Sequence, residues 1–413
     1  MDSPATCEKC GLAPTSTALP WGTVTLLAMT AFSSSGMMRM LDPMLPRLAL
    51  EYGVPIGRAA WTITGFAVAY GLLQAFFGPL GDRLGKLRVI AGTAAIAVLA
   101  CLACVLASGS FTGLIVARVI AGACCAAVIP LSMAWIGDAV PYEGRQTVLA
   151  RFMIGQMTGM ASGQTIGGFA AEHSFWQWPF IFFSAVFALA ALLLWRSLAQ
   201  AEAAHTRSPA LAGNTAQALL EVLRRPWVRV VLLVVLLEAI FFLGAFTFIA
   251  THLHLAGGMS LKAAGLTLIA FSAGGVGFAL IISRYSGRIG EVRMAALGTL
   301  LSALPLIALA LWPQASVAVA AAFVSGVGFY MLHNTLQTNA TQMAPDRRGA
   351  AVALFATSFF LGQAIGVAIF GAVNDRVGTL PALLIGAVGL LPVGWWFAWA
   401  LRVRRDTLSR LSA

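Results

Sequence analysis

The 413-residue chain is 59% hydrophobic and only 10% charged, and its mean hydropathy is +0.87. No water-soluble domain of this size could expose so much apolar surface, so the sequence predicts a protein whose solvent is lipid. A net charge of +11 would suggest nucleic acid as the partner of a soluble protein. Here the basic residues lie between apolar runs, and membrane orientation explains them without nucleic acid.

The N-terminal tail and the cysteines indicate neither a cleaved leader nor a metal site. No positive cluster precedes the first apolar run, so we expect residues 1–18 to remain as a cytoplasmic tail. Cys7 and Cys10 form a lone C-x-x-C that lacks the second ligand pair of a zinc site. The sequence therefore predicts no metal and no disulfide framework.

Apolar stretches long enough to cross about 30 Å of hydrocarbon occur twelve times. The first six are expected near residues 20–48, 58–80, 88–108, 111–137, 147–170 and 178–198. The second six are expected near residues 227–250, 262–283, 293–312, 315–343, 350–373 and 380–402. The predicted fold class is an all-α integral membrane protein with twelve transmembrane helices.

The basic residues between these spans predict the orientation. With both termini in the cytoplasm, twenty of the 26 Lys and Arg side chains fall inside and four fall outside, namely Arg47, Arg58, Lys262 and Arg376. This bias follows the positive-inside rule and predicts a multi-pass protein of the cell inner membrane. The polar stretch 199–226 divides the spans six and six, as a cytoplasmic linker between bundles at 19–198 and 227–403. Residues 404–413 are expected to form a cytoplasmic C-terminal tail.

An internal duplication supports this division. Arg83, Gly85 and Arg88, in the loop after the second span, recur 205 positions later as Arg288, Gly290 and Arg293. Gly122 and Pro141 recur 204 positions later as Gly326 and Pro345. A period of half the chain, at matching places in each half, indicates two repeated six-helix bundles.

The loop after the second span also carries a family signature. The loop from Gly78 to Arg88 matches a G-x-L-x-D-R-x-G-basic pattern, with Asp82, Arg83 and Gly85 at its fixed positions and Lys86 as the basic residue. In this respect the chain resembles the major facilitator superfamily, and within it the branch of 12-helix drug:proton antiporters. The resemblance covers nearly the whole chain. It implies two pseudo-symmetric six-helix bundles that move a solute by alternating access, and it assigns this loop to a conformational latch against the opposite bundle. The alternative is a solvated turn.

The fifth span contains a glycine motif of the same branch. Gly159, Gly163, Gly167 and Gly168 resemble its G-x-x-x-G-P-x-x-G-G motif, but Gln164 stands where the pattern has proline. That proline is thought to bend the helix, so the departure weakens the inference of export. Glycines four apart let two helix backbones approach closely, which suits a sliding interface as well as ordinary small-residue packing.

Four charged residues fall inside predicted spans: Arg39, Asp42, Arg118 and Glu238. A charge in hydrocarbon is costly, so we expect these side chains to face a cavity or one another. Arg39 and Asp42 are three apart on one helical face and are expected to pair. Glu238 lies roughly 16 Å into its span, near the midplane, where a carboxyl group can exchange a proton as access alternates.

We therefore hypothesise that Glu238 or Asp42 carries a coupling proton and that Arg118 modulates its proton affinity. The alternative is a static Arg39–Asp42 ion pair beside a protonated Glu238 that has no role. The resemblance places the first, fourth, seventh and tenth spans around a central cavity. On the tenth and seventh spans, the candidate cavity residues are His333, Asn334, Gln337 and Phe242.

Together these observations predict a secondary transporter. Neither a D-D-x-x-D nor an H-E-x-x-H pattern occurs, which argues against an enzyme, and the lack of a Walker A pattern argues against an ATP-driven pump. The preferred function is a monomeric, proton-coupled exporter of small organic or drug-like compounds. It uses the proton gradient and no cofactor. The alternative is a proton symporter or facilitator for a metabolite such as a sugar or an amino acid.

Overall fold

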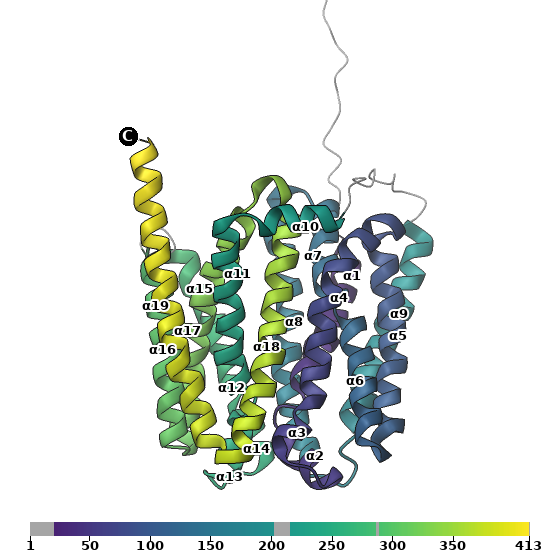
Figure 1. Ribbon diagram of the computed structural model, residues 1–413. Coiled ribbons are helices and arrows are strands. Elements are labelled where there is room, and N and C mark those ends of the chain that lie inside the picture. Colours follow the sequence, from purple (N-terminus) through teal and green to yellow (C-terminus); the bar gives the residue numbers. More distant parts are fainter. Residues whose placement is uncertain (1–19, 202–214, 286–288, 413) are drawn as a thin grey trace, which may run out of the picture.

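The computed structural model describes residues 20–201, 215–285 and 289–412. Within these ranges every regular element is a helix. The predicted tail 1–18 and the central part of the predicted linker lie outside the described residues, as does Arg288 of the duplicated loop. Figure 1 shows the two halves of the chain as neighbouring groups of roughly parallel helices, with the beginning of α1 and the end of α19 on the same side.

The first half contains six spans, of which four are made of more than one helical segment. The helices are α1 (Trp21–Arg39), α2 (Leu45–Tyr52), α3 (Ile56–Ala59), α4 (Trp61–Leu84), α5 (Lys86–Leu106), η1 (Ala107–Gly109), α6 (Phe111–Cys125), α7 (Val128–Ala139), α8 (Tyr142–Ala171) and α9 (Trp178–Ala201). The predicted first span is broken at residues 40–44, beside Pro43 and Pro46. The predicted fourth span is divided at residues 126–127 into α6 and α7.

The second half repeats this plan after α10 (Thr215–Leu223). Its seventh span consists of α11 (Pro226–Glu238), the π segment η2 (Ala239–Leu243), α12 (Gly244–Phe246) and α13 (Ile249–Leu255). The remaining spans are α14 (Leu261–Thr267) with α15 (Ile269–Tyr285), α16 (Glu291–Leu311), α17 (Ala315–Gln342), η3 (Pro345–Arg347) with α18 (Arg348–Val377), and α19 (Thr379–Ser412).

Two polar segments contain helix. The predicted C-terminal tail after residue 403 belongs to α19, which continues as helix to Ser412. Its Arg404 guanidinium lies 4.3 Å from the ring centroid of Trp227 on α11, and this contact holds the extension against the second half. Within the predicted linker, Thr215–Leu223 forms α10. Glu221 of this helix pairs with Arg347, and Arg225 just after it pairs with Asp346.

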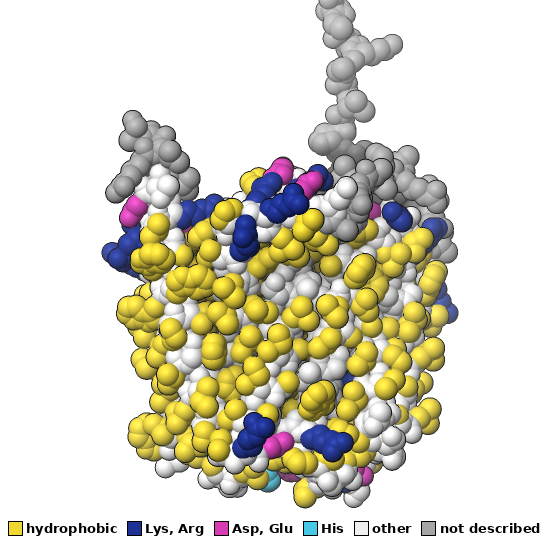
Figure 2. All heavy atoms as spheres, viewed as in Figure 1, with side chains coloured by type: hydrophobic (Ala, Val, Ile, Leu, Met, Phe, Trp, Pro, Cys, Tyr) yellow, Lys and Arg dark blue, Asp and Glu magenta, His cyan; other side chains and the backbone are white. Residues whose placement is uncertain are grey.

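The surface matches a membrane environment. Ten helices of the described chain are long and apolar enough to cross a bilayer. The other two of the twelve expected spans, α1 and α8, have 19 and 30 residues but are less apolar and pack against each other. In Figure 2 hydrophobic side chains cover a broad band, and Lys, Arg, Asp and Glu gather near its two edges. This distribution is the one expected of a multi-pass membrane protein.

Glycines of the predicted motif bring α8 into direct contact with α1. Gly159, Gly163 and Gly167 face backbone atoms of Phe32, Gly36 and Met40, so that a side chain at any of the three would collide with the α1 main chain. Gly168 faces Leu261 and Gly265 of α14, in the other half. The close approach expected from glycines four apart is confirmed.

The same arrangement recurs in α18, which the sequence analysis did not single out. Gly362 and Gly366 face the backbones of Leu236 and Ile240 in the seventh span, and Gly371 faces Gly57 of α3 in the other half. These three glycines stand 203 positions after Gly159, Gly163 and Gly168. Each half therefore has one glycine-lined helix that packs closely on its own bundle and then touches the opposite one.

This packing predicts that one added methyl group on α8 destabilises the protein. Gly163→Ala places a Cβ against the backbone of Gly36, and overpacking of this kind costs about 1–3 kcal/mol. Gly92→Ala on α5 is the matched control, because nothing lies within 4 Å of its added Cβ. Thermal unfolding in detergent should show a lower midpoint for Gly163→Ala and an unchanged or higher one for Gly92→Ala. Equal midpoints would contradict the assignment.

The two halves meet mainly at the end where α3 and α14 begin. One buried cluster combines first-half residues with Phe248, Leu261, Val367 and Phe370 of the second half. The interface continues to Tyr70 and Phe360, whose ring centroids are 4.2 Å apart, and to a hydrogen bond from the Thr357 hydroxyl to the Gly71 carbonyl. The structure is thus closed at the α3 end.

Candidate functional site

The Arg39–Asp42 pair lies at the break that follows α1. The Arg39 Nη1 and Asp42 Oδ2 atoms are 3.3 Å apart, and the two residues are 5% and 0% exposed. The predicted pairing is confirmed. The turn at residues 40–44 folds the Asp42 carboxylate inward. Across the interface, the Arg39 guanidinium lies 5.5 Å from the ring centroid of Phe246.

Glu238 forms a second buried pair, which joins two helices of the second half. Its Oε2 lies 2.9 Å from Nδ1 of His333 on α17, and Glu238 is fully buried. The other carboxylate oxygen, Oε1, has no partner among the described residues. Glu238 is the last residue before the π segment, and such segments occur frequently at functional sites. The sequence placed both residues near the cavity but did not predict that they pair.

Arg118 lies between three helices of the first half. Its side chain is fully buried and donates hydrogen bonds from Nε to the Thr62 carbonyl at 3.2 Å and from Nη1 to the Met37 carbonyl at 2.9 Å. Its guanidinium also lies 4.3 Å from the ring centroid of Phe66. Arg118 therefore connects α6 to α1 and to the start of α4. The hypothesis that Arg118 modulates the proton affinity of Glu238 or Asp42 stays a prediction.

Aromatic rings surround the Glu238–His333 pair. The imidazole of His333 lies 5.3 Å from the ring centroid of Phe329 and 4.6 Å from that of Phe359. Phe242, a predicted cavity residue, is only 1% exposed and stacks on Phe329 at 5.0 Å. Phe242 is packed among other side chains in this conformation, and its role as a cavity residue stays a prediction. Phe242 forms the packed layer behind Phe329, and Phe246 connects that layer to Arg39.

The other predicted cavity residues of α17 are accessible. Asn334 and Gln337 are exposed, and together with partly exposed His333 they lie within a little more than one helical turn. The polar face continues through Thr338 and Thr341, which the sequence analysis missed although both fit the same helical spacing. This part of α17 offers amide and hydroxyl groups on the α10 side of the buried pair.

The signature loop has its ion pairs within its own bundle. Lys86 Nζ lies 3.0 Å from Asp82 and 2.7 Å from Asp138 of α7. The predicted contact of Asp82 with the opposite half is therefore not present in this conformation. Gly85 has φ +93°, a backbone conformation that favours glycine. Gly78 has no neighbouring atom of the described chain within 4 Å of the position that a Cβ would take. Arg83 and Arg88 are exposed.

Gln164, the residue that replaces proline in the glycine motif, is fully buried. Neither its amide oxygen nor its amide nitrogen has a partner among the described residues, and α8 runs unbroken from Tyr142 to Ala171. Gln363 on α18 has the same properties at 1% exposure. Buried amides without partners are rare, so these two side chains are candidates to bind water or a solute between the halves.

Comparisons with known proteins agree with this geometry. The family model described as Major Facilitator Superfamily matches residues 27–367 and 241–412. The uncharacterized MFS-type transporter YceJ of Bacillus subtilis is 26% identical over 340 residues, which cover 80% of this chain and 84% of the relative. The multidrug export protein EmrB of Haemophilus influenzae is 28% identical over 193 residues, which cover 46% of this chain and 38% of EmrB.

A solved structure shows the same fold. The crystal structure of the nucleoside transporter NupG superposes with a TM-score of 0.73 at 14% sequence identity, and the match covers 91% of this chain and 98% of that one. At this identity the likeness concerns the arrangement of the helices alone.

Proposed function

Because this chain belongs to the major facilitator superfamily and is therefore a multi-pass membrane transporter, we propose that it is a proton-coupled exporter of small organic compounds. It works by alternating access, in which the two bundles rock around a site between them. The proton gradient drives transport without a cofactor, and one copy of the chain forms the transport unit.

The observation that carries the proposal is the Glu238–His333 pair. Carboxylate and imidazole both bind and release protons, whereas the guanidinium of Arg39 stays charged beside Asp42. Of the two acids proposed from the sequence, Glu238 is thus the better candidate for the proton carrier. Asp42 is the better candidate for a structural ion pair with Arg39. The free Oε1 of Glu238 leaves one position for a proton or for a solute group.

In the proposed cycle, a proton from the periplasm binds the Glu238–His333 pair when the α3 end is open. The added charge weakens binding of a solute next to the aromatic rings of Phe329 and Phe359, and the solute leaves outward. After the bundles rock, the proton leaves to the cytoplasm and a new solute binds. One proton enters for each solute exported, and the energy comes from the different proton concentrations on the two sides.

We further propose that the chain lies in the inner membrane with both ends in the cytoplasm. The positive-inside bias of the loops supports this orientation. In that orientation the α3 end is periplasmic, and the structure is closed to the periplasm. Asn334 and Gln337 then lie on the cytoplasmic side, where a solute enters from the cell.

The second candidate function is a proton symporter or facilitator for a metabolite. The unbroken α8 with Gln164 favours it, because the proline of the antiporter motif is missing. The name of EmrB, a multidrug export protein, supports export. The name of NupG, a nucleoside transporter, supports transport of a metabolite, and each likeness is limited in extent. The direction of proton flow relative to the solute separates the two functions.

Transport into proteoliposomes with an imposed pH gradient tests the proposal. A panel of organic cations, amphipathic drugs, nucleosides, sugars and amino acids is offered, with protein-free liposomes and a proton ionophore as controls. We expect an organic compound to move against the proton flow and to stop moving when the ionophore is added. Co-transport of a metabolite with protons would establish the second function instead.

A further inference from the structure

Two acidic side chains at the α3 end form hydrogen bonds across the interface between the halves. Glu172, directly after α8, accepts a hydrogen bond at Oε1 from the backbone N–H of Lys262, at 2.8 Å. Asp375, near the end of α18, accepts one at Oδ1 from the backbone N–H of Gly57, at 2.7 Å. The proposed proton pathway uses neither residue.

The two hydrogen bonds are equivalent under the internal repeat. Glu172 and Asp375 are 203 positions apart, the same separation as that of the contact glycines Gly168 and Gly371. The donors, Gly57 and Lys262, are 205 positions apart, and each is the second residue of the helix that begins its span, α3 or α14. The acid of each half thus reaches the corresponding amide of the other half, although the residue types differ.

Close backbone packing positions both acids. Gly371 lies against Gly57, and Gly168 lies against Gly265, so the acceptor helix and the donor helix touch one turn before each acid. The side chain of Lys262 does not compete for Glu172, because its Nζ lies 4.4 Å from the ring centroid of Phe169. Both acceptors therefore recognise main chain, which makes their bonds independent of the side chains opposite.

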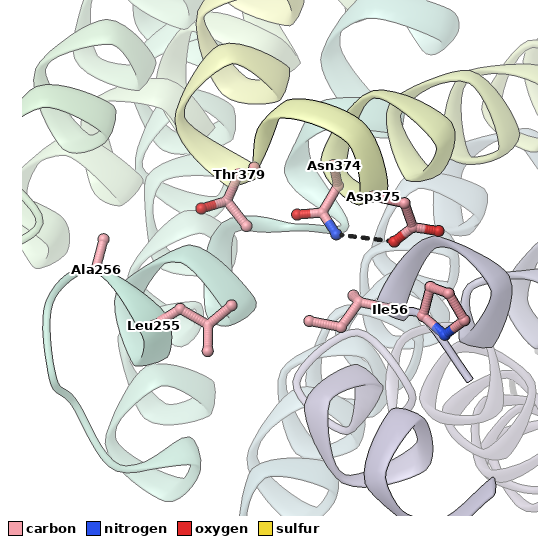
Figure 3. A pocket seen from close by; sticks show the side chains of 8 residues that line it. Ile56, Leu255, Ala256, Asn374, Asp375 and Thr379 are labelled. Carbon is pink, nitrogen blue, oxygen red and sulfur yellow. Dashed lines mark hydrogen bonds between the residues drawn. The ribbon is translucent and has the colours of Figure 1, made fainter. Parts of the chain in front are cut away.

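The Asp375 bond borders a pocket of about 440 Å³ on the seam between the halves. Figure 3 shows Ile56 on one side of this pocket and Leu255, Asn374 and Thr379 on the other, with the Asn374 amide directed at Asp375. The Asn374 Nδ2 donates to Asp375 Oδ1 at 3.4 Å and so fixes the orientation of the carboxylate. A movement of the bundles apart would open this seam and break the bond to Gly57.

We propose that Glu172 and Asp375 are a symmetric pair of latches that hold the α3 end closed, and that both must break before the transporter opens on that side. One latch lies on the seam between α8 and α14, and the other on the seam between α18 and α3. Because the two seams are related by the internal repeat, a single rocking movement separates both. The proposal requires alternating access but not proton coupling.

Thiol labelling measures opening at the α3 end directly. Val367 is fully buried in the cluster that joins the halves, so Val367→Cys should react with an impermeant maleimide, added outside intact cells, only when this end opens. Against this background, Glu172→Ala with Asp375→Ala is expected to raise the labelling rate about tenfold, and each single variant less. Glu172→Gln with Asp375→Asn keeps an acceptor oxygen and should give an intermediate rate.

Glu51→Gln is the matched control. Glu51 also lies at the α3 end, but it pairs with Arg47 of its own helix at 3.0 Å, so its neutralisation should leave the rate unchanged. Rates are normalised to monodisperse protein, and labelling of the chain without Val367→Cys is subtracted. An unchanged rate in both double variants, or an equal rise with Glu51→Gln, would overturn the latch. Because labelling needs no substrate, failure here is distinct from failure of the proposed transport reaction.

Discussion

Glu238→Gln is expected to reduce proton-driven transport in proteoliposomes to the background of protein-free liposomes. Glutamine keeps the shape of the side chain and can still hydrogen bond to His333, but it cannot bind and release a proton at neutral pH. Exchange of labelled for unlabelled solute, which needs no net proton movement, should continue. The loss is therefore expected in gradient-driven transport and not in solute binding.

Two further variants make this prediction specific. Glu221→Gln removes an exposed acid on α10, paired with Arg347 at 3.2 Å, and should leave transport unchanged. His333→Gln removes the second proton-exchanging group of the pair and should weaken the dependence of transport on pH. If Glu238→Gln transports with the pH dependence of the parent protein, Glu238 is not the proton carrier.

Arg39→Met is expected to destabilise the protein by about 3–5 kcal/mol, because it leaves the fully buried Asp42 carboxylate without its partner. Asp42→Asn added to Arg39→Met should recover most of this loss, since the neutral amide needs no counter-charge. The free energy of unfolding, measured by SDS titration in mixed micelles, checks both expectations.

Arg47→Met is the matched comparison for the buried pair. Arg47 and Glu51 form an ion pair at 3.0 Å, but both side chains are about one third exposed, so solvent screens the interaction and the expected loss is about 0.2–1 kcal/mol. Equal destabilisation by Arg39→Met and Arg47→Met would show that the protein loses no more stability from losing the arginine when the ion pair is buried than when it is exposed.

Local sequence patterns predicted the parts of the structure that depend on neighbouring residues. Hydropathy predicted the spans, including α1 and α8, which are less apolar than the other ten. The i,i+3 spacing of Arg39 and Asp42 predicted their pairing. Glycine spacing in α8 predicted its close contact with α1. Each of these inferences needs only the helical period and the residue types within one helix.

Interactions between residues far apart in the sequence could not be predicted from these local patterns. Glu238 and His333 are 95 positions apart, and only the packing of α11 on α17 determines that they meet. The partners of Arg118 are backbone carbonyls, which carry no sequence signal. By contrast, Gly362, Gly366 and Gly371 were recognisable, because they repeat the α8 glycines at the period of the duplication. A systematic comparison of the two halves would have found them.

The π segment after Glu238 has a consequence for the orientation of everything that follows it on the seventh span. An added residue in a helix rotates the later side chains by about 100° around the axis, relative to an uninterrupted helix. With this phase shift, Glu238 faces His333 while Phe246 faces Arg39, and His252 reaches Thr379 and the Ala310 carbonyl. Five residues of altered winding thereby let one helix present its acid to its own bundle and its aromatic ring to the other.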